Sequence, residues 1–146
     1  MLKRIIYLII LLVIFSCEKN NNSPNIIFIL TDDLGYGDLS SYGSETIKTT
    51  NIDKLAEDGV KLTSYYAAQP VCSASRAAIL TGAYPNRIGI YNAFGPTSNS
   101  GINHDEYTLA EMLKDKGYKT GIFGKWHLGS IKEFFPTKHG FDEFYG

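Results

Sequence analysis

The chain has 146 residues, of which 44% are hydrophobic and 20% charged, a balance typical of a globular protein with one core. Its 14 basic and 15 acidic residues give a net charge of −1, without the excess of positive charge expected of a nucleic-acid-binding domain. These values argue against nucleic acid as a partner.

The first sixteen residues have the features of a signal peptide. Lys3 and Arg4 come before the eleven uncharged, apolar residues 5–15. As a helix, this run would span ~17 Å, well short of the ~30 Å of a bilayer core. The small residue directly before Cys17 resembles the end of a bacterial lipobox. We therefore expect a lipoprotein signal peptide over residues 1–16, with ordinary cleavage beside an incidental cysteine as the alternative.

A lipid on Cys17 would anchor the mature protein to a membrane, and the lipidated residue and polar tether would occupy residues 17–24. Either kind of leader implies export, and the lipobox implies the bacterial cell envelope, in the periplasm or at the outer membrane. Two cysteines in an exported protein usually suggest a disulfide, but lipidation would leave Cys72 alone. A lone thiol in an oxidising compartment needs burial or a chemical role.

Residues 25–146 have the pattern of an α/β fold with a largely parallel sheet between helices. The apolar run 25–30 is continuous, as in a strand that is buried on both faces. A helix is expected over residues 51–58, with Thr50 as its N-cap, and a strand over residues 60–66. Helices that alternate with strands favour a layered α/β architecture.

The second half of the chain continues this alternation. We expect a helix over residues 73–80, a loop over residues 88–101 and a further helix capped by Thr108. A strand over residues 118–123 follows. The sequence beyond it contains no recognisable closing element, and a parallel sheet covered by helices normally needs more chain. The sequence therefore predicts a truncated domain.

Two short motifs contain residues that could bind a metal or an anion. Asp32 and Asp33 follow the first expected strand, and paired carboxylates are hard ligands suited to Ca²⁺ or Mg²⁺. Taken alone, an Asp-Asp pair before a glycine is more often a simple turn. Cys72 and Arg76 lie one turn apart at a helix N-terminus, which favours an anion there. Taken alone, this pair is better explained as a buried thiol beside a solvated arginine.

A third motif contains Lys125 and His127, two residues apart at an expected strand end, where both side chains would point to one side. Lysine supplies a fixed positive charge, and histidine exchanges protons near neutral pH. The alternative is an exposed edge with Trp126 turned inward. His104 and His139 match no such motif and are expected at the surface or in turns.

Together, these motifs resemble those of the sulfatase family. Residues 70–82 are similar to the first sulfatase signature, Cys-x-Pro/Ala-x-Arg, with Ala74 where proline is commoner. Residues 117–129 resemble the second signature, and residues 31–38 resemble the opening metal motif of the family. Three motifs in the right order are far more specific than any one of them. The resemblance extends over residues 25–146, and it implies that they form the incomplete, N-terminal part of a sulfatase catalytic domain.

The resemblance implies an alkaline-phosphatase-like α/β fold and hydrolysis of an aryl or carbohydrate sulfate ester. Cys72 would be converted to formylglycine by a formylglycine-generating or anaerobic sulfatase-maturing enzyme, and the hydrated aldehyde would attack sulfur. Asp32, Asp33 and residue 72 would hold a divalent metal, with Ca²⁺ expected and Mg²⁺ as the alternative.

The resemblance also implies roles for the cationic residues. Arg76 would hold the hydrate, and Lys125 and His127 would bind the sulfate oxygens, with His127 as a candidate base. The expected substrate is a sulfated small molecule or polysaccharide. Ca²⁺ needs six to eight oxygen ligands, more than these residues supply, so we expect the 146-residue chain alone to have negligible activity.

Two other functions fit the same motifs. One is a phosphate or phosphonate ester hydrolase of the same superfamily, and the other is a catalytically inactive lipoprotein that binds sulfated glycans. Relative rates of hydrolysis of matched sulfate and phosphate esters test the first alternative. The second is tested by whether Cys72 is formylglycine or an unmodified thiol.

Overall fold

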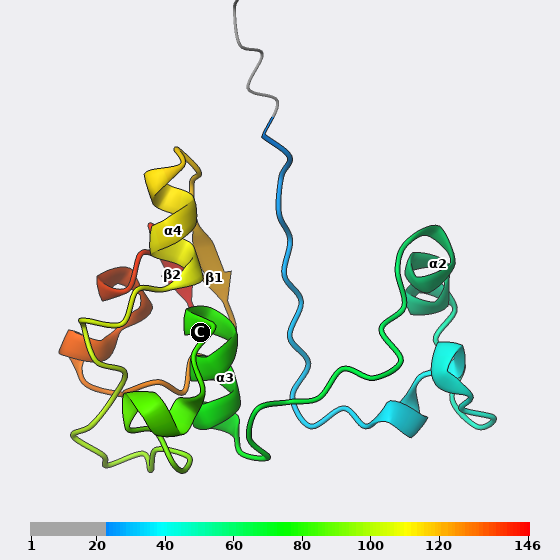
Figure 1. Cartoon of the computed structure of the whole chain (residues 1–146), viewed down its shortest axis with the longest axis horizontal. Coiled ribbons are helices and arrows are strands. Elements are labelled where there is room, and N and C mark those ends of the chain that lie inside the picture. Colours follow the sequence, from blue (N-terminus) through cyan, green and yellow to red (C-terminus); the bar gives the residue numbers. More distant parts are fainter. Residues whose placement is uncertain (1–22) are drawn as a thin grey trace, which may run out of the picture. The chain divides into compact units, whose positions relative to one another are not determined.

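The computed structural model in Figure 1 describes residues 23–146, so the signal peptide expected over residues 1–16 and the lipidation site Cys17 lie outside the described residues. After Thr31 the described chain divides into two units, residues 23–31 and Asp32–Gly146, each of which is considered by itself. No helix within residues 23–146 is both long enough and apolar enough to cross a membrane.

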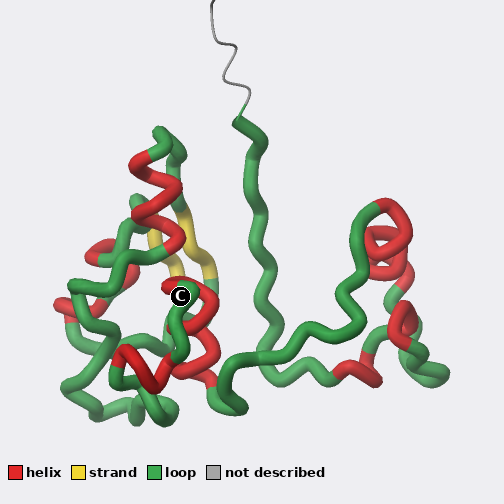
Figure 2. Tube along the Cα trace, in the orientation of Figure 1, coloured by secondary structure: helices red, strands yellow, loops and turns green. Residues whose placement is uncertain are grey.

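Short helices account for most of the regular structure in the second unit, and loops and turns connect them (Figure 2). The α-helices are α2 (Thr50–Asp58), α3 (Cys72–Thr81) and α4 (Leu109–Asp115). Short 3₁₀ helices precede α2 at Tyr36–Asp38 and Ser40–Tyr42, separate α3 from α4 at Pro85–Ile88, and follow α4 at Lys132–Phe134 and Pro136–Lys138. All three expected helices are confirmed, as is the irregular backbone after Ile88.

The helix ends follow from local chemistry. Thr108 caps α4 as expected: its hydroxyl accepts the Glu111 N–H at 3.2 Å, and the Glu111 carboxylate accepts the Thr108 N–H at 2.7 Å. The expected cap at Thr50 is wrong, because Thr50 is already helical and Thr49 holds the cap position. The Thr49 hydroxyl is instead bonded to Asp53 within the first turn.

The sheet of the described residues has two parallel strands, β1 (Gly121–Phe123) and β2 (Glu143–Tyr145), with Ile122 opposite Phe144. β1 is shorter than the strand expected over residues 118–123, because pairing begins only where the Thr120 carbonyl accepts the N–H groups of residues 142 and 143. β2 was not expected, since its three residues offer little local signal.

The strands expected over residues 25–30 and 60–66 are both wrong. A strand exists only through hydrogen bonds to a neighbouring strand, and the single sheet of the described residues includes neither segment. Their apolar side chains are exposed, from 42% for Leu30 to 86% for Val60.

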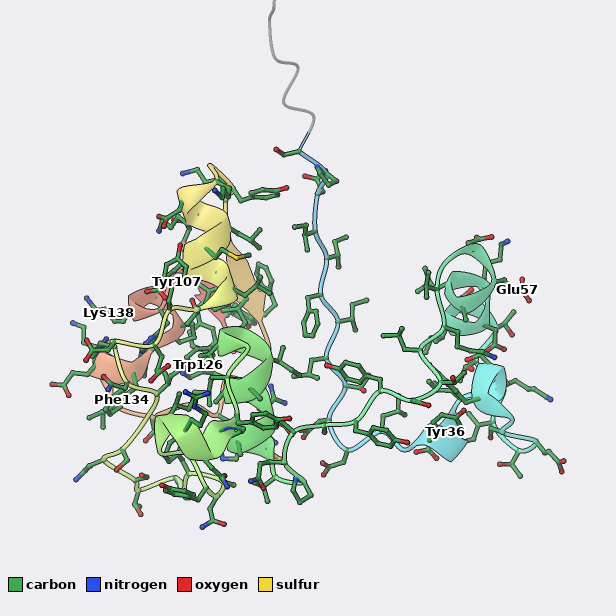
Figure 3. All side chains as sticks on the ribbon, viewed as in Figure 1. Tyr36, Glu57, Tyr107, Trp126, Phe134 and Lys138 are labelled. Atoms are coloured by element: carbon green, nitrogen blue, oxygen red, sulfur yellow. The ribbon has the colours of Figure 1, made fainter. Side chains whose placement is uncertain are left out.

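The core of the second unit lies between α3 and the segments that precede and follow β1. Its buried apolar residues are Ala74, Ala77, Ile90, Ile102, Trp126 and Leu128. Trp126 is turned inward, and its indole N–H donates to the Phe134 carbonyl at 2.7 Å (Figure 3). His139 lies in a turn, one of its two expected settings, but it is fully buried, with its ring stacked on His104. His104 lies exposed in a turn, as expected.

Candidate active site

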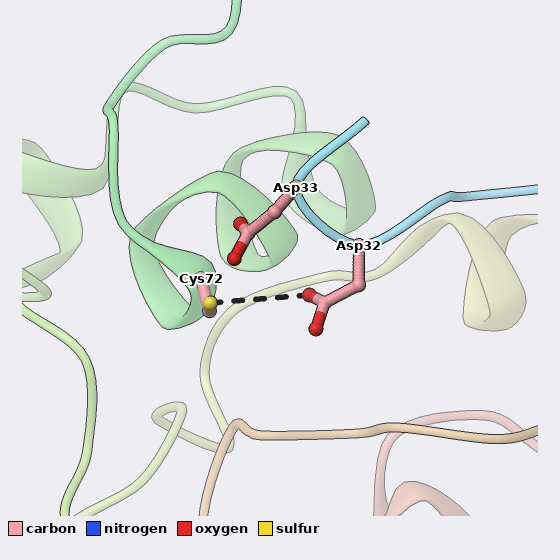
Figure 4. A group of neighbouring side chains, drawn as sticks. All are labelled: Asp32, Asp33 and Cys72. Carbon is pink, nitrogen blue, oxygen red and sulfur yellow. Dashed lines mark hydrogen bonds between the residues drawn. The ribbon is translucent and has the colours of Figure 1, made fainter. Parts of the chain in front are cut away.

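Cys72 is the first residue of α3, and its sulfur lies close to both an acidic and a basic side chain. The thiol Sγ is 3.9 Å from Asp32 Oδ1 and 3.5 Å from Lys125 Nζ. Figure 4 shows the carboxylates of Asp32 and Asp33 on the side of Cys72, and one ligand atom from each of these three residues lies within 4.8 Å of the other two. Residues forty positions apart in sequence are thus brought to one point.

Two basic side chains donate hydrogen bonds to the Asp32 carboxylate. Lys125 Nζ donates to Asp32 Oδ2 at 2.9 Å and to Oδ1 at 3.2 Å, and Arg76 Nη2 donates to Oδ1 at 3.2 Å. The hydrogen bond from Lys125, followed by that from Arg76, lowers the pKa of the Asp32 carboxyl. The same bond raises the pKa of Lys125, and a weaker contribution comes from Cys72. Both groups therefore remain charged over a wide range of pH.

Arg76 connects α3 to the segment that follows β1. Arg76 lies one helical turn beyond Cys72 on α3, and its Nη1 donates to the Lys125 carbonyl at 2.5 Å. Its side chain is only 11% exposed. A nearly buried guanidinium with two fixed acceptors is rigid, and it holds the Lys125 backbone in place beside the thiol.

Two residues of the candidate site have an unusual backbone. Among the described residues, Asp33 and His127 are the non-glycine residues with positive φ, and both have φ of 55°. This left-handed conformation is unfavourable for side chains with a Cβ, and such strain concentrates at functional sites. Its presence at two motif residues supports a chemical role for both.

No hydrogen bond within residues 23–146 joins the His127 ring to Asp32, Cys72 or Lys125. The ring Nε2 lies 2.8 Å from the Phe94 carbonyl oxygen, while Nδ1 is shielded from solvent and has no hydrogen-bond partner in the described part of the chain. β1 ends at Phe123 and the backbone turns left-handed at His127, so the regular strand geometry on which the expected common direction of Lys125 and His127 rested is absent.

Sequence reasoning missed Ser73. This fully buried residue donates its hydroxyl proton to the His127 carbonyl at 2.6 Å and accepts the Phe94 N–H at 3.0 Å. Its place directly after Cys72 was the only available signal, and nothing in the loop sequence distinguishes Phe94.

The donor atoms near Cys72 fit a hard divalent cation in part. The carboxylates of Asp32 and Asp33 suit Ca²⁺ or Mg²⁺, and the lowered pKa of Asp32 keeps that ligand ionised. A thiol is a soft ligand that these metals bind poorly, whereas an oxygen at position 72 would make all three ligand atoms hard. The group therefore fits the metal best when residue 72 carries oxygen.

A family model described as Sulfatase matches residues 24–146. The chain belongs to the sulfatase family. It is 47% identical over 131 residues to N-acetylgalactosamine-6-sulfatase of Sus scrofa and 51% identical over 126 residues to arylsulfatase A of Bos taurus. Each alignment covers 84% of this chain, which spans about a quarter of the length of these relatives (25%).

Solved sulfatase-family structures are similar in fold. The crystal structure of Ps i-CgsB has a TM-score of 0.79 and 45% sequence identity, over 83% of this chain and 27% of that one. The structure of BT4656 with its substrate D-glucosamine-2-N,6-O-disulfate has a TM-score of 0.70 and 36% identity, over 83% of this chain and 22% of that one. The expected α/β, alkaline-phosphatase-like fold class is thereby confirmed.

Proposed function

We propose that this sulfatase-family protein, at its full natural length, hydrolyses the sulfate ester of a carbohydrate or aryl substrate with a formylglycine made from Cys72. The observation that carries the proposal is the position of Cys72 Sγ, 3.9 Å from a carboxylate of Asp32 and 3.5 Å from the ammonium of Lys125. The name of its arylsulfatase relative and the sulfated sugar bound by BT4656 support these substrate classes.

Conversion by a formylglycine-generating or anaerobic sulfatase-maturing enzyme replaces the thiol of Cys72 with an aldehyde, whose hydrate offers two hydroxyls where cysteine has one nucleophile. Arg76, fixed between Asp32 and the Lys125 carbonyl, orients the groups that surround residue 72. Lys125 supplies a permanent positive charge beside that residue, where fixed donors stabilise charge that develops on sulfate oxygens. His127 is the base that takes the proton of the second hydroxyl of residue 72 when sulfate is expelled and the aldehyde is restored.

Asp32, Asp33 and residue 72 would hold the divalent cation, Ca²⁺ or Mg²⁺. Such an ion orients the sulfate group and lowers the pKa of a hydroxyl bound to it. These residues fill only part of the six to eight oxygen positions that Ca²⁺ prefers. We therefore expect the 146-residue chain alone to have negligible turnover.

The test uses the protein at its full natural length, produced together with a maturing enzyme. Mass spectrometry of the peptide that contains Cys72 is expected to show the loss of one sulfur and two hydrogens and the gain of one oxygen. Release of sulfate from an aryl sulfate and from a 6-sulfated amino sugar is expected, and Cys72→Ala and EDTA should each abolish it. An unmodified thiol in an inactive protein would contradict the proposal and favour a sulfated-glycan-binding lipoprotein.

A matched pair of variants tests the metal site. Asp32→Asn removes a carboxylate that lies beside Cys72 and should greatly reduce turnover. Asp58→Asn changes an exposed carboxylate outside the three motifs, paired with Lys54 at 2.8 Å, and should leave turnover almost unchanged. Matched sulfate and phosphate esters provide the last control, since faster release of phosphate would instead favour the phosphate or phosphonate ester hydrolase.

The same proposal includes a location, an exported lipoprotein of the bacterial cell envelope that is anchored through Cys17. The run of eleven apolar residues before that cysteine supports it. Cys17→Ser should move the protein from the membrane fraction to the soluble fraction in its native host. Unchanged membrane association would contradict lipidation at this position.

A further inference from the structure

Ser73 is the residue next to Cys72, and its hydroxyl joins two segments distant in sequence. It is fully buried, it donates to the His127 carbonyl at 2.6 Å, and it accepts the Phe94 N–H at 3.0 Å. One hydroxyl therefore uses both its donor and its acceptor capacity to hold the loop at Phe94 against the backbone of His127.

The contact between the His127 ring and that loop determines which ring nitrogen carries hydrogen. Nε2 lies 2.8 Å from the Phe94 carbonyl oxygen, and a carbonyl only accepts hydrogen bonds. Nε2 must therefore be the N–H nitrogen, and in the neutral ring the lone pair lies on Nδ1. Nδ1 is shielded from solvent and has no partner among residues 23–146, so its lone pair is not used within the described chain.

The backbone of His127 needs support to hold this ring position. Its φ of 55° lies in the left-handed region, which is uncommon for a residue with a Cβ and is kept where the surroundings stabilise it. The hydroxyl of Ser73 is bonded to the carbonyl of this same residue, and thus stabilises the peptide that directs the ring toward Phe94.

We propose that Ser73 is a positioning residue that, through the Phe94 carbonyl, holds His127 in the Nε2–H tautomer and presents Nδ1 as the proton acceptor of the reaction. The inference rests on the proposed function, in which His127 exchanges a proton. The second hydroxyl of the residue 72 hydrate gives its proton to the lone pair of Nδ1, the electrons of the broken O–H bond form the aldehyde C=O bond, and the C–O bond to the departing sulfate breaks. The ring becomes an imidazolium, and the Nε2–H bond to Phe94 stabilises its positive charge. A water molecule that enters when sulfate leaves then takes the proton from Nδ1 and restores the neutral ring.

The first test is the nitrogen NMR spectrum of the full-length protein labelled in histidine. The chain has 3 histidines, and His127→Gln identifies the signals of His127 by their disappearance. A protonated Nε2 and an unprotonated Nδ1 at neutral pH are expected. The opposite tautomer in the wild-type protein would overturn the proposal, whether or not any variant folds.

The second test compares two serine hydroxyls on α3. Ser73→Ala should give mixed tautomers at His127 and lower kcat about tenfold or more, with little change in KM. Ser75→Ala is the matched control, because its hydroxyl also donates to a main-chain carbonyl, that of Gln69, and it should change neither measurement. Ser73→Thr keeps the hydroxyl and should restore much of the lost kcat.

Equal effects of Ser73→Ala and Ser75→Ala on kcat and on the His127 tautomer would overturn the positioning role. A wild-type protein without any turnover would instead overturn the proposed function, and the tautomer of His127 would still be measurable. The two failures are therefore distinguishable.

Discussion

In residues 39–62, hydrogen bonds converge on one carboxylate, whereas in residues 72–145 apolar side chains are buried together. Asp53 accepts hydrogen bonds from the Ser40 hydroxyl at 2.5 Å, the Ser41 N–H at 2.8 Å and the Thr49 hydroxyl at 2.8 Å. No residue of 39–62 is fully buried. Residues 72–145 contain all the fully buried apolar side chains of the described chain.

This difference shows that the two regions respond to different perturbations. Loss of volume weakens a close-packed core, and loss of charge or of a hydrogen-bond partner weakens a polar network. Cys72 and Lys125 of the candidate site belong to the core region. We therefore expect these two residues to be held more stably than Asp32 and Asp33, which lie outside it.

The largest effect is expected from a cavity in the core. Ile102 is fully buried, so Ile102→Ala should lower the free energy of unfolding by about 2–5 kcal/mol, measured by urea denaturation of the full-length protein. Ile52→Ala in α2 is the matched control, because that side chain is 43% exposed and should cost much less. Equal losses would contradict the distinction between the two regions.

A smaller effect is expected from the cap of α4. Thr108→Ala removes the hydroxyl that accepts the Glu111 N–H and that donates to the His139 carbonyl at 2.9 Å. It should lower the free energy of unfolding by about 1–2 kcal/mol. Thr108→Ser should recover most of this loss in the same denaturation experiment, and a serine variant as unstable as the alanine variant would argue against capping.

Asp142 should make the core region sensitive to strong acid. The hydrogen bond that it accepts from Lys114, followed by that from the Thr120 N–H, lowers the pKa of this carboxyl from 3.8 to about 2. Because the pKa is lower in the folded state, the carboxylate stabilises the fold fully above pH 3.8. This stabilisation is lost as the pH falls from 3.8 to about 2. Asp142→Asn should flatten the dependence of Tm on pH there, and an unchanged slope would be inconsistent with this role.

The smallest global effect is expected in residues 39–62, where the response should be local. Asp53→Asn should increase amide hydrogen exchange at Ser41 and along α2, because the variant lacks the charge that three donors share. Amides near Ile102 should exchange as before. Asp58→Asn, whose partner is the exposed Lys54, provides the control on the same helix and should have little effect.

The helices were predictable from the sequence because their signals are local. The capping box of α4 and the glycine with φ of 67° at residue 82 after α3 act within one turn of chain. Strands depend on distant partners, so an apolar run such as residues 25–30 predicts burial without showing what it pairs with. β1 pairs with β2, whose sequence has no periodic pattern from which this pairing could be predicted.

The candidate site was predictable in its composition and less so in its geometry. The motifs predicted that Cys72, Asp32 and Lys125 would gather, and they lie together. The supporting contacts of His127 were not predictable, because Phe94 acts through a carbonyl that every residue possesses. Ser73 acts through a hydroxyl whose burial depends on the folded core.

The left-handed backbone at Asp33 bears on the evolution and engineering of this protein. Asp33 is exposed and holds φ of 55°, so glycine at this position would relieve strain and remove one of the two clustered carboxylates at the same time. A library selected for heat resistance alone should therefore accept glycine at position 33. A library selected for sulfate release should retain aspartate there, so the two selections should yield different residues at position 33.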